Sequence, residues 1–164
     1  MDYARLTTRP QARLTSGHVL FAVVALVVFA LDRLTKSLVV ANVPYDTEVA
    51  AIDHVVGITN VHNSGAAFGF APAGATFFLI AAVAVAIGLA IYVARNSGDL
   101  RADAVLGLIM GGTLGNGYER IFNGTVTDFI NVHFWPVFNV ADSAISIGVV
   151  ALLAGYVLRK PDTA

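Results

Sequence analysis

The chain alternates between long apolar segments and short polar connections, and the charged residues mark where each apolar segment stops. The segments without Asp, Glu, Lys or Arg run from Leu14 to Leu31, from His54 to Ala94, from Ala104 to Tyr118 and from Ser143 to Leu158. A helix needs about 20 mostly apolar residues to cross a bilayer. The pattern therefore predicts four transmembrane helices, near 17–38, 71–94, 102–122 and 138–158.

Two of the connections, 42–70 and 123–137, are long enough to carry structure of their own. The stretch from Val49 to Asn60 is rich in Val, Ile and Thr and partly alternates, which predicts one or two short strands. A further strand is expected from Thr125 to Val132. The predicted fold is an all-α membrane protein of four transmembrane helices, with a small β element on the outer membrane surface.

The composition supports a membrane protein built as one domain, residues 1–164. Hydrophobic residues make up 57% of the chain and charged residues only 13%, whereas soluble domains carry about 25% charged residues. The net charge of -1 argues against a nucleic-acid partner, because such a partner requires a basic face. The absence of cysteine excludes disulfides, thiolate zinc sites and cysteine nucleophiles.

Basic residues predict the orientation in the membrane. Seven of the ten Lys and Arg residues flank the same ends of the predicted helices: Arg5, Arg9, Arg13, Arg95, Arg101, Arg159 and Lys160. Because cytoplasmic connections are enriched in Lys and Arg, both termini are expected in the cytoplasm. The first apolar segment is longer than the core of a signal peptide, and no good A-x-A site follows it, so we expect it to be an uncleaved span.

Polar residues from four separate segments gather at the opposite, outer ends of the predicted helices. They are Asp32, Arg33, Lys36, Asn63, Asn116, Glu119, Arg120, Asp128 and Asp142. Ionisable groups at membrane depth usually mark function, although a layer of structural ion pairs at the interface is the alternative. The i,i+4 spacing predicts an ion pair between Asp32 and Lys36, and the same spacing places Asn116 and Arg120 on one helix face.

Gly107, Gly111 and Gly115 form two overlapping G-x-x-x-G motifs in the third predicted helix. Such a stripe of small residues allows helices to approach closely. We interpret it as packing within the bundle rather than homodimerisation, and we expect a monomer.

Asp128 and Asp142 have no evident local partner and lie among apolar residues. Two carboxylates in a low dielectric cannot both ionise easily, so one retains its proton while the other acts as a base. Such a pair can activate a water for attack on a peptide carbonyl. This chemistry requires neither a cofactor nor a metal, and the sequence does not decide which aspartate holds the proton.

Three alternatives differ in chemistry. A Ser/Lys dyad would use Lys36 with Ser64 or Ser143, but no nucleophile motif surrounds either serine. A metal site would use histidines that are scattered without an H-E-x-x-H pattern: His18, His54, His62 and His133. A small transporter or membrane scaffold would use the intramembrane carboxylates, yet such proteins are expected to carry mid-span carboxylates and inverted repeats.

Four motifs, in order along the chain, resemble the bacterial lipoprotein signal peptidase (signal peptidase II) family. Leu31-Asp32-Arg33-Leu34-Thr35-Lys36 is similar to its D-x-x-[ST]-K signature, and Asn63 to Gly69 to its N-[TS]-G-A-A-F-[GS] motif. Gly111 to Arg120 resembles G-G-x-x-G-N-x-x-D-R, with Glu119 in place of the family's Asp. Gly124 to Ile130 and Phe138 to Ser143 resemble G-x-V-x-D-F and F-N-x-A-D-[SA].

The resemblance implies an aspartyl endopeptidase of the bacterial cytoplasmic (inner) membrane, with Asp128 and Asp142 as its catalytic dyad near the outer leaflet. Its substrates would be diacylglyceryl-modified prolipoproteins, cut on the N-terminal side of the lipidated cysteine while membrane lipids surround the enzyme. Residues matching positions around the dyad and substrate are Asn63, Asn116, Arg120, Asn139 and Ala141. Asp32, Lys36 and Glu119 match positions of structural support, and the family fold has four transmembrane helices with an outer β-cradle.

Overall fold

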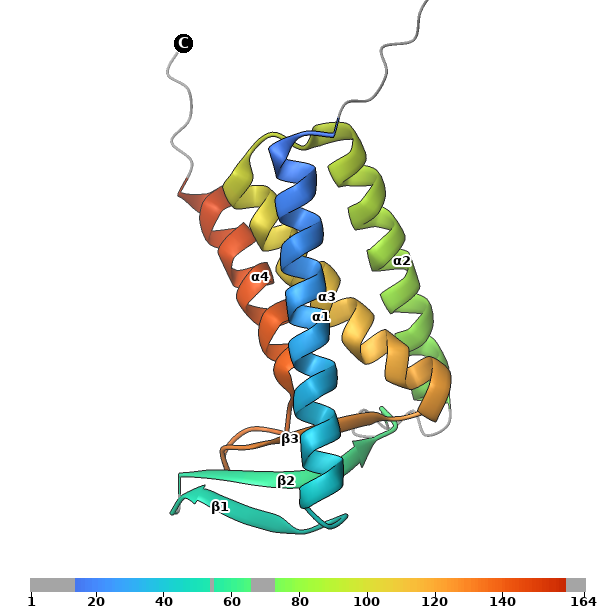
Figure 1. Ribbon diagram of the computed structural model, residues 1–164, viewed down its shortest axis with the longest axis vertical. Coiled ribbons are helices and arrows are strands. Elements are labelled where there is room, and N and C mark those ends of the chain that lie inside the picture. The colour runs from blue at the N-terminus through green and yellow to red at the C-terminus, as the bar shows by residue number, and fades with distance from the viewer. Residues whose placement is uncertain (1–13, 54, 66–72, 159–164) are drawn as a thin grey trace, which may run out of the picture.

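The computed structural model describes residues 14–53, 55–65 and 73–158 (Figure 1). It contains four helices and one small antiparallel sheet. Several residues named in the sequence analysis lie outside the described parts of the chain. They are Arg5, Arg9, Arg13, His54, Arg159, Lys160 and the end of the Asn63 to Gly69 motif.

The helices are α1 (Ser16–Asn42), α2 (Ala73–Asn96), α3 (Leu100–Asn123) and α4 (Val140–Val157). The first helix continues beyond the predicted end near residue 38, because Lys36 is buried inside the protein and does not mark a helix end in water. The last helix begins at Val140 rather than near 138, because Asn139 caps it. The side chain of Asn139 accepts a hydrogen bond from the N–H of Asp142, as N-cap residues do.

Three of these helices, α1, α2 and α4, are long and apolar enough to cross a membrane. Their apolar side chains are largely exposed on the protein surface, which fits a lipid surrounding rather than water. The remaining described helix, α3, is not among these three, so the structure supports three of the four predicted spans. It carries charged residues in both its first and its last turn, Asp103 and Arg120. It is also the helix with the most buried residues.

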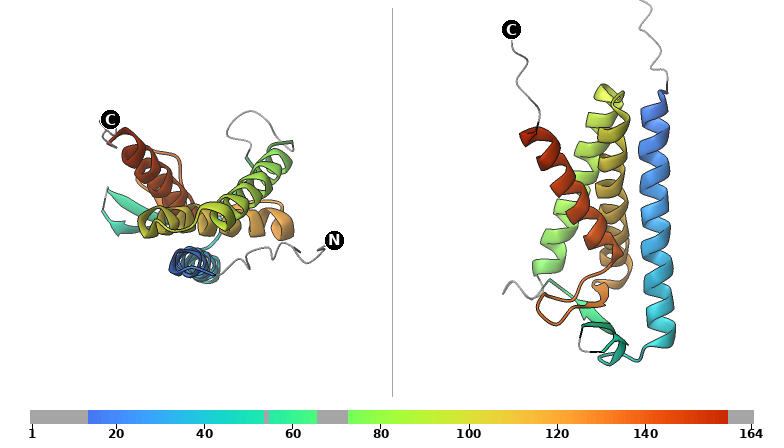
Figure 2. Two further views of the ribbon diagram at one scale, coloured as in Figure 1. Left: turned by 90° about the horizontal axis from the view of Figure 1, so that it is seen from above. Right: turned by 90° about the vertical axis from the view of Figure 1, so that its left-hand side faces the viewer.

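The third helix is the centre of the bundle and packs against α1, α2 and α4. Viewed along the bundle, α1 lies on one side of α3, while α2 and α4 diverge on the other (Figure 2). Its glycines allow this close packing: a Cβ added at Gly107 or Gly111 would meet the backbone or side chains of α1, and one at Gly112 would meet Ala141 of α4. The prediction that the G-x-x-x-G stripe packs within the bundle is confirmed.

The sheet has the order β1-β2-β3, with β1 (Glu48–Ile52), β2 (Val56–Asn63) and β3 (Val126–Asn131). Both pairings are antiparallel, and a register shift interrupts the β2–β3 pairing between Ile58 and Val61. The predicted strands between Val49 and Asn60 and between Thr125 and Val132 are thus confirmed as a three-stranded sheet.

The sheet lies at one end of the helix bundle (Figure 1). The start of α1, the end of α4 and the connection between α2 and α3 lie at the other end. The last turns of α1, the end of α3 and the start of α4 therefore meet the sheet, and this is where the predicted site residues are brought together.

Candidate active site

Asp128 reaches the site from the middle of β3. Val61 of β2 is its cross-strand partner, so Asn63, two residues further along, lies diagonally on the same face. The Asn63 Nδ2 donates a hydrogen bond of 2.9 Å to Oδ2 of Asp128, and the Oδ1 of Asn63 accepts one of 2.7 Å from the N–H of Gly65. Gly65 has a positive φ of 81°, a conformation that glycine adopts without strain. The turn after β2 thus fixes the amide that holds Asp128.

Asp142 reaches the site from the first turn of α4. It forms a reciprocal capping box with Asn139: the N–H of Asp142 donates to Asn139 Oδ1 at 2.9 Å, and the N–H of Asn139 donates to Asp142 Oδ2 at 3.2 Å. This arrangement explains the three-residue spacing of Asn139 and Asp142. The helix N-terminus also stabilises negative charge, so the position favours an ionised carboxylate.

Two buried asparagines connect the two aspartates. Asn139 Nδ2 donates to Asp128 Oδ1 at 2.6 Å and to Asn116 Oδ1 at 3.1 Å, while Asn116 Nδ2 donates to Asp142 Oδ1 at 2.7 Å. With the bonds described above, every carboxylate oxygen of Asp128 and Asp142 accepts one hydrogen bond. Both side chains are therefore held in fixed orientations by donors from β2, α3 and the start of α4.

A buried ion cluster contacts this network through Lys36, which donates a hydrogen bond to Asn116. The cluster joins α1, α3 and β3. Lys36 Nζ lies 2.9 Å from Asp32 Oδ2 and 3.1 Å from Glu119 Oε2, and Arg33 Nη1 lies 3.1 Å from Glu119 Oε1. Glu119 also accepts hydrogen bonds from the N–H and the hydroxyl of Thr127 in β3, at 2.9 and 3.0 Å. The predicted pair of Asp32 and Lys36 is confirmed.

The glutamate that departs from the family pattern thus serves as a buried junction. Glu119 holds two cations of α1 and the strand residue beside Asp128. Thr127 itself was missed by the sequence analysis, because nothing in the local sequence indicates that a strand hydroxyl binds a carboxylate eight residues earlier.

Both aspartates line one cavity of about 540 Å³ between α2, α3 and α4. Asn63, Asn116 and Arg120 line it as well, so the prediction that Asn116 and Arg120 share a face is confirmed. The guanidinium carbon of Arg120 lies 5.2 Å from the ring centre of Phe78. The Nε of Arg120 is buried and makes no hydrogen bond within the described structure. The cavity thus combines two carboxylates, two amides and one guanidinium with an apolar wall.

That apolar wall comes from the helices and from the segment before α4. The residues that form it are Phe78, Ala82 and Val85 of α2, Ile109 of α3, Trp135, Pro136, Val137 and Phe138 of the connection, and Ile145 and Val149 of α4. The cavity therefore extends from the carboxylates along the lipid-exposed helices, where an apolar chain or side chain fits.

Burial raises the pKa of Asp128 to about 6. The hydrogen bonds from Asn63 and Asn139 oppose this rise in pKa, whereas the negative charge of Asp142 adds to it. The charge of Asp142 thus acts in the direction expected when two carboxyl groups share a site.

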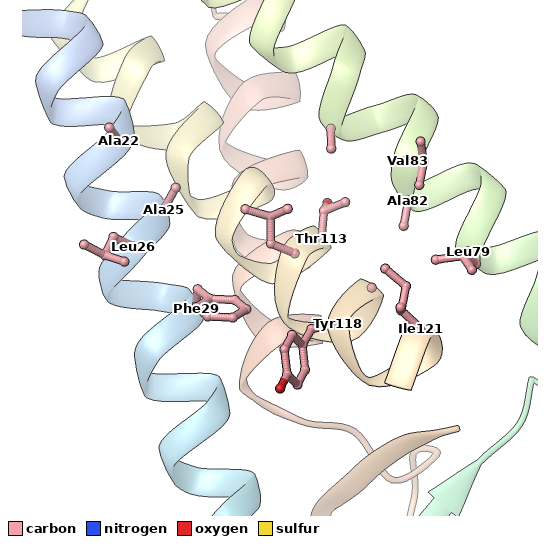
Figure 3. Close-up of a pocket in the computed structure, with 13 residues that line it drawn as sticks. Ala22, Ala25, Leu26, Phe29, Leu79, Ala82, Val83, Thr113, Tyr118 and Ile121 are labelled. Carbon is pink, nitrogen blue, oxygen red and sulfur yellow. The ribbon is translucent and has the colours of Figure 1, made fainter. Parts of the chain in front are cut away.

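A second cavity, of about 470 Å³, lies between α1, α2 and α3 (Figure 3). Its lining is almost entirely apolar, and the polar side chains among its lining residues are Thr113 and Tyr118. No carboxylate lines it, so the polar groups required for hydrolysis lie in the first cavity.

The remaining candidate residues occupy supporting positions. Ala141 is fully buried and does not line the first cavity; its N–H donates to Asp32 Oδ1 at 3.1 Å. The Ser/Lys alternative finds no support, because Lys36 contacts two carboxylates and an amide, and Ser143 donates its hydroxyl to the carbonyl of Asn139.

The chain matches the family model described as signal peptidase (SPase) II over residues 24–158. It is 38% identical over 138 residues to a lipoprotein signal peptidase of Bacillus subtilis (strain 168), a match that covers 81% of this chain and 90% of that protein.

Solved structures agree with this match. A bacterial membrane enzyme determined by the in meso method at 1.9 Å resolution superposes with a TM-score of 0.80 and 28% identity, over 85% of this chain and 94% of that one. A second, at 2.3 Å resolution, gives a TM-score of 0.77 and 27% identity, over 88% and 94% of the two chains. The family decides against the transporter and scaffold alternatives: this chain belongs to the signal peptidase II family and is a membrane peptidase that removes signal peptides from prolipoproteins.

Proposed function

We propose that Asp128 and Asp142 form the catalytic dyad of an aspartyl endopeptidase. The observation that carries this proposal is that the two carboxyl groups, from β3 and α4, line one cavity and are joined by hydrogen bonds through Asn116 and Asn139. Their oxygens are held by amide and backbone donors, so the pair is oriented before a substrate binds. Preorganised polar groups of this kind stabilise a transition state without further reorganisation.

Asp142 acts as the general base, because the N-terminus of α4 and two donors stabilise its carboxylate. Asp128 carries the proton in the reactive form of the pair, because burial raises its pKa to about 6. This form predominates below about pH 6 and becomes a minority as the pH rises further. Asp142 removes a proton from a water, whose oxygen attacks the scissile carbonyl carbon, while Asp128 donates its proton to the carbonyl oxygen. The tetrahedral intermediate then collapses: its C–N bond breaks, the leaving amine takes up the proton held by Asp142, and one hydroxyl of the intermediate returns its proton to Asp128 as the C=O of the new carboxyl group forms.

The other cavity residues have supporting roles in this proposal. Asn63, Asn116 and Asn139 orient the two carboxyl groups, and the guanidinium of Arg120, which lines the same cavity, binds substrate carbonyl groups. Ala141 has a backbone role, since its N–H bonds Asp32. Glu119 and Asp32 give structural support by pairing with the cations of α1.

We propose that the substrate is a diacylglyceryl-modified prolipoprotein cut on the N-terminal side of its lipidated cysteine. It reaches the dyad laterally between α2 and α4, where the cavity has apolar walls on lipid-exposed helices. The acyl chains then remain in the bilayer during cleavage. This arrangement needs no metal or other cofactor, and the enzyme works as a monomer.

In this proposal all four helices of a single domain, 1–164, cross the bacterial inner membrane. The central helix α3 is shielded from lipid by its neighbours, which is why its composition is less apolar. The sheet and the dyad then lie near the outer leaflet, and both termini lie in the cytoplasm, as Arg95 and Arg101 at the α2–α3 connection favour.

Substrate lipidation tests the proposed specificity. The purified enzyme in detergent is given the same prolipoprotein with and without the diacylglyceryl group on its cysteine. We expect cleavage of the lipidated form and, by mass spectrometry, a product that begins with the lipidated cysteine. Equal cleavage of both forms, or a product beginning elsewhere, would contradict the proposal.

A further inference from the structure

Lys36 contacts a neutral amide in addition to the two carboxylates with which it forms ion pairs. Its ammonium pairs with Asp32 and Glu119, and it also donates a hydrogen bond of 2.7 Å to Asn116 Oδ1. An ammonium has N–H donors and no acceptor, so Lys36 can contact Asn116 only as a donor. The side chain is 1% exposed, which means that water does not replace any of these contacts.

This contact fixes the direction of the Asn116 amide. Because Lys36 only donates, Asn116 must present its oxygen to the ammonium, and its Nδ2 then faces Asp142 Oδ1 at 2.7 Å. The Nδ2 of Asn139 donates to the same oxygen and favours the same orientation. A flipped amide would set N–H groups against the ammonium and an oxygen against the carboxylate. The buried cation thus selects the amide orientation that suits an ionised Asp142.

The positive charge also strengthens the bond between Asn116 and Asp142. A cation at the carbonyl oxygen polarises the amide, and hydrogen bonds in series reinforce one another where the dielectric is low. The charges around Asp142 come from every neighbouring element: Lys36 and Asp32 from α1, Glu119 and Arg120 from α3, and Asp128 from β3. Among these cations, Lys36 is joined to Asp142 by two short hydrogen bonds in series, through Asn116.

We propose that Lys36 is a positioning residue for the dyad. Lys36 holds Asp142 as a carboxylate by orienting and polarising the side-chain amide of Asn116. The inference rests on the proposed dyad and goes beyond the structural role that the family resemblance implies for this lysine. It connects a cation buried in α1 to the base on α4 through a single amide of α3.

The test compares Lys36→Met with the matched control Arg33→Met. Both remove one cation that pairs with Glu119, but Arg33 does not contact Asn116. We expect Lys36→Met to lower kcat by roughly 10- to 100-fold, the size of one hydrogen bond to a charged group, with KM little changed. The acidic limb of its kcat/KM profile should move to higher pH, whereas Arg33→Met leaves the limb in place.

A mutant cycle separates positioning from general structural damage. If Lys36 acts through Asn116, the double variant Lys36→Met/Asn116→Ala should have the same kcat/KM as Asn116→Ala alone. An unmoved acidic limb together with additive losses would overturn the proposal. If Asp142→Asn retains turnover, the dyad itself is wrong; if it is inactive while Lys36→Met is unimpaired, only the role of Lys36 falls.

A second pair of variants covers the case in which Lys36→Met does not fold. Asp32→Asn/Lys36→Met removes the buried ion pair as a unit, a change that often preserves stability, while Asp32→Asn alone leaves Lys36 on Asn116. The loss of kcat and the moved acidic limb are expected in the double variant and not in Asp32→Asn. Identical profiles for these two variants would also overturn the proposal.

Discussion

Asn139 caps a helix and also holds one of the two proposed catalytic aspartates. Its Oδ1 caps α4 by accepting from the N–H of Asp142, and its Nδ2 donates to Asp128 at 2.6 Å. The residue is fully buried, so water does not supply either contact. Stability and activity therefore depend on different atoms of the same amide.

Substitutions at Asn139 should separate these two contributions. Asn139→Ser retains a good N-cap but loses the donor to Asp128, so we expect near wild-type thermal stability with kcat/KM reduced roughly 10- to 100-fold. Asn139→Ala should show the same kinetic loss and, in addition, lose about 1 kcal/mol of stability. Thermal unfolding and cleavage assays on both variants check this; full activity in Asn139→Ser would contradict it.

The raised pKa of Asp128 has a consequence for stability. The carboxyl titrates at about 6 in the folded protein and at 3.8 in the unfolded chain. Below pH 3.8 both states are protonated, so its ionisation carries no folding penalty. As the pH rises from about 4 through 6, the folded state loses stability relative to the unfolded state, by up to about 3 kcal/mol.

The unfolding midpoint of Asp128→Asn should therefore rise relative to that of the wild type as the pH increases from 4 to 7.5, because the amide has no charge to bury. The NH2 group of this amide faces a donor of Asn63 or Asn139, and that cost is the same at every pH. Thermal unfolding in detergent across this pH range measures the rise. A difference from wild type that is independent of pH would show that the burial of Asp128 does not oppose folding.

At the scale of the helices, the site depends on how closely α1 approaches α3. A Cβ added at Gly111 would lie 2.6 Å from the backbone oxygen of Ala25 and 2.6 Å from the Cβ of Val28. Backbone atoms at that distance must move, and α1 carries Lys36 and Asp32 to the site. The glycine stripe of α3 thus sets the position of the buried cation.

Gly111→Ala should lower both the unfolding temperature and kcat, because it separates α1 from α3. Gly88 in α2 is a matched control, since nothing lies within 4 Å of an added Cβ there. Gly88→Ala should leave activity unchanged and raise stability by up to about 1 kcal/mol, the difference in helix propensity. Equal effects of the two substitutions on unfolding would rule out close packing as the role of Gly111.

Contacts between residues close in the sequence could be predicted, whereas contacts between residues far apart in the sequence could not. The Asp32–Lys36 pair was predictable because i,i+4 neighbours meet on any helix. The bond from Lys36 to Asn116 joins residues 80 positions apart and depends on how α1 crosses α3. The motifs identified both aspartates, but no local pattern indicated that Thr127 and Glu119 join β3 to the helices, since that contact needs the fold itself.

For the molecule as a whole, the distribution of charge implies one orientation in the membrane. The sheet and the end of α1 lie at one end of the bundle, and the α2–α3 connection with Arg95 and Arg101 lies at the other. The positive-inside rule assigns the second end to the cytoplasm. In this proposed orientation, we expect the lipid-exposed walls of the cavity to bring the proposed dyad within reach of a substrate anchored in the outer leaflet.

The absence of cysteine in the chain makes this orientation directly measurable. Single cysteines are introduced as Asp53→Cys, in an exposed turn of the sheet, and as Gly98→Cys, in the α2–α3 connection. A membrane-impermeant thiol reagent applied to intact cells should label the first and spare the second until the membrane is opened. The reverse pattern would invert the proposed topology.

Replacement of each aspartate tests the central claim most directly. Asp128→Asn and Asp142→Asn keep the shape of the side chains, and the exposed Asp53→Asn serves as control. Each purified variant is checked for folding by thermal unfolding and then assayed for cleavage of a diacylglyceryl-modified prolipoprotein in detergent. The dyad predicts that both site variants fold but lose cleavage by several orders of magnitude, while the control cleaves at the wild-type rate; wild-type turnover in either folded site variant would contradict it.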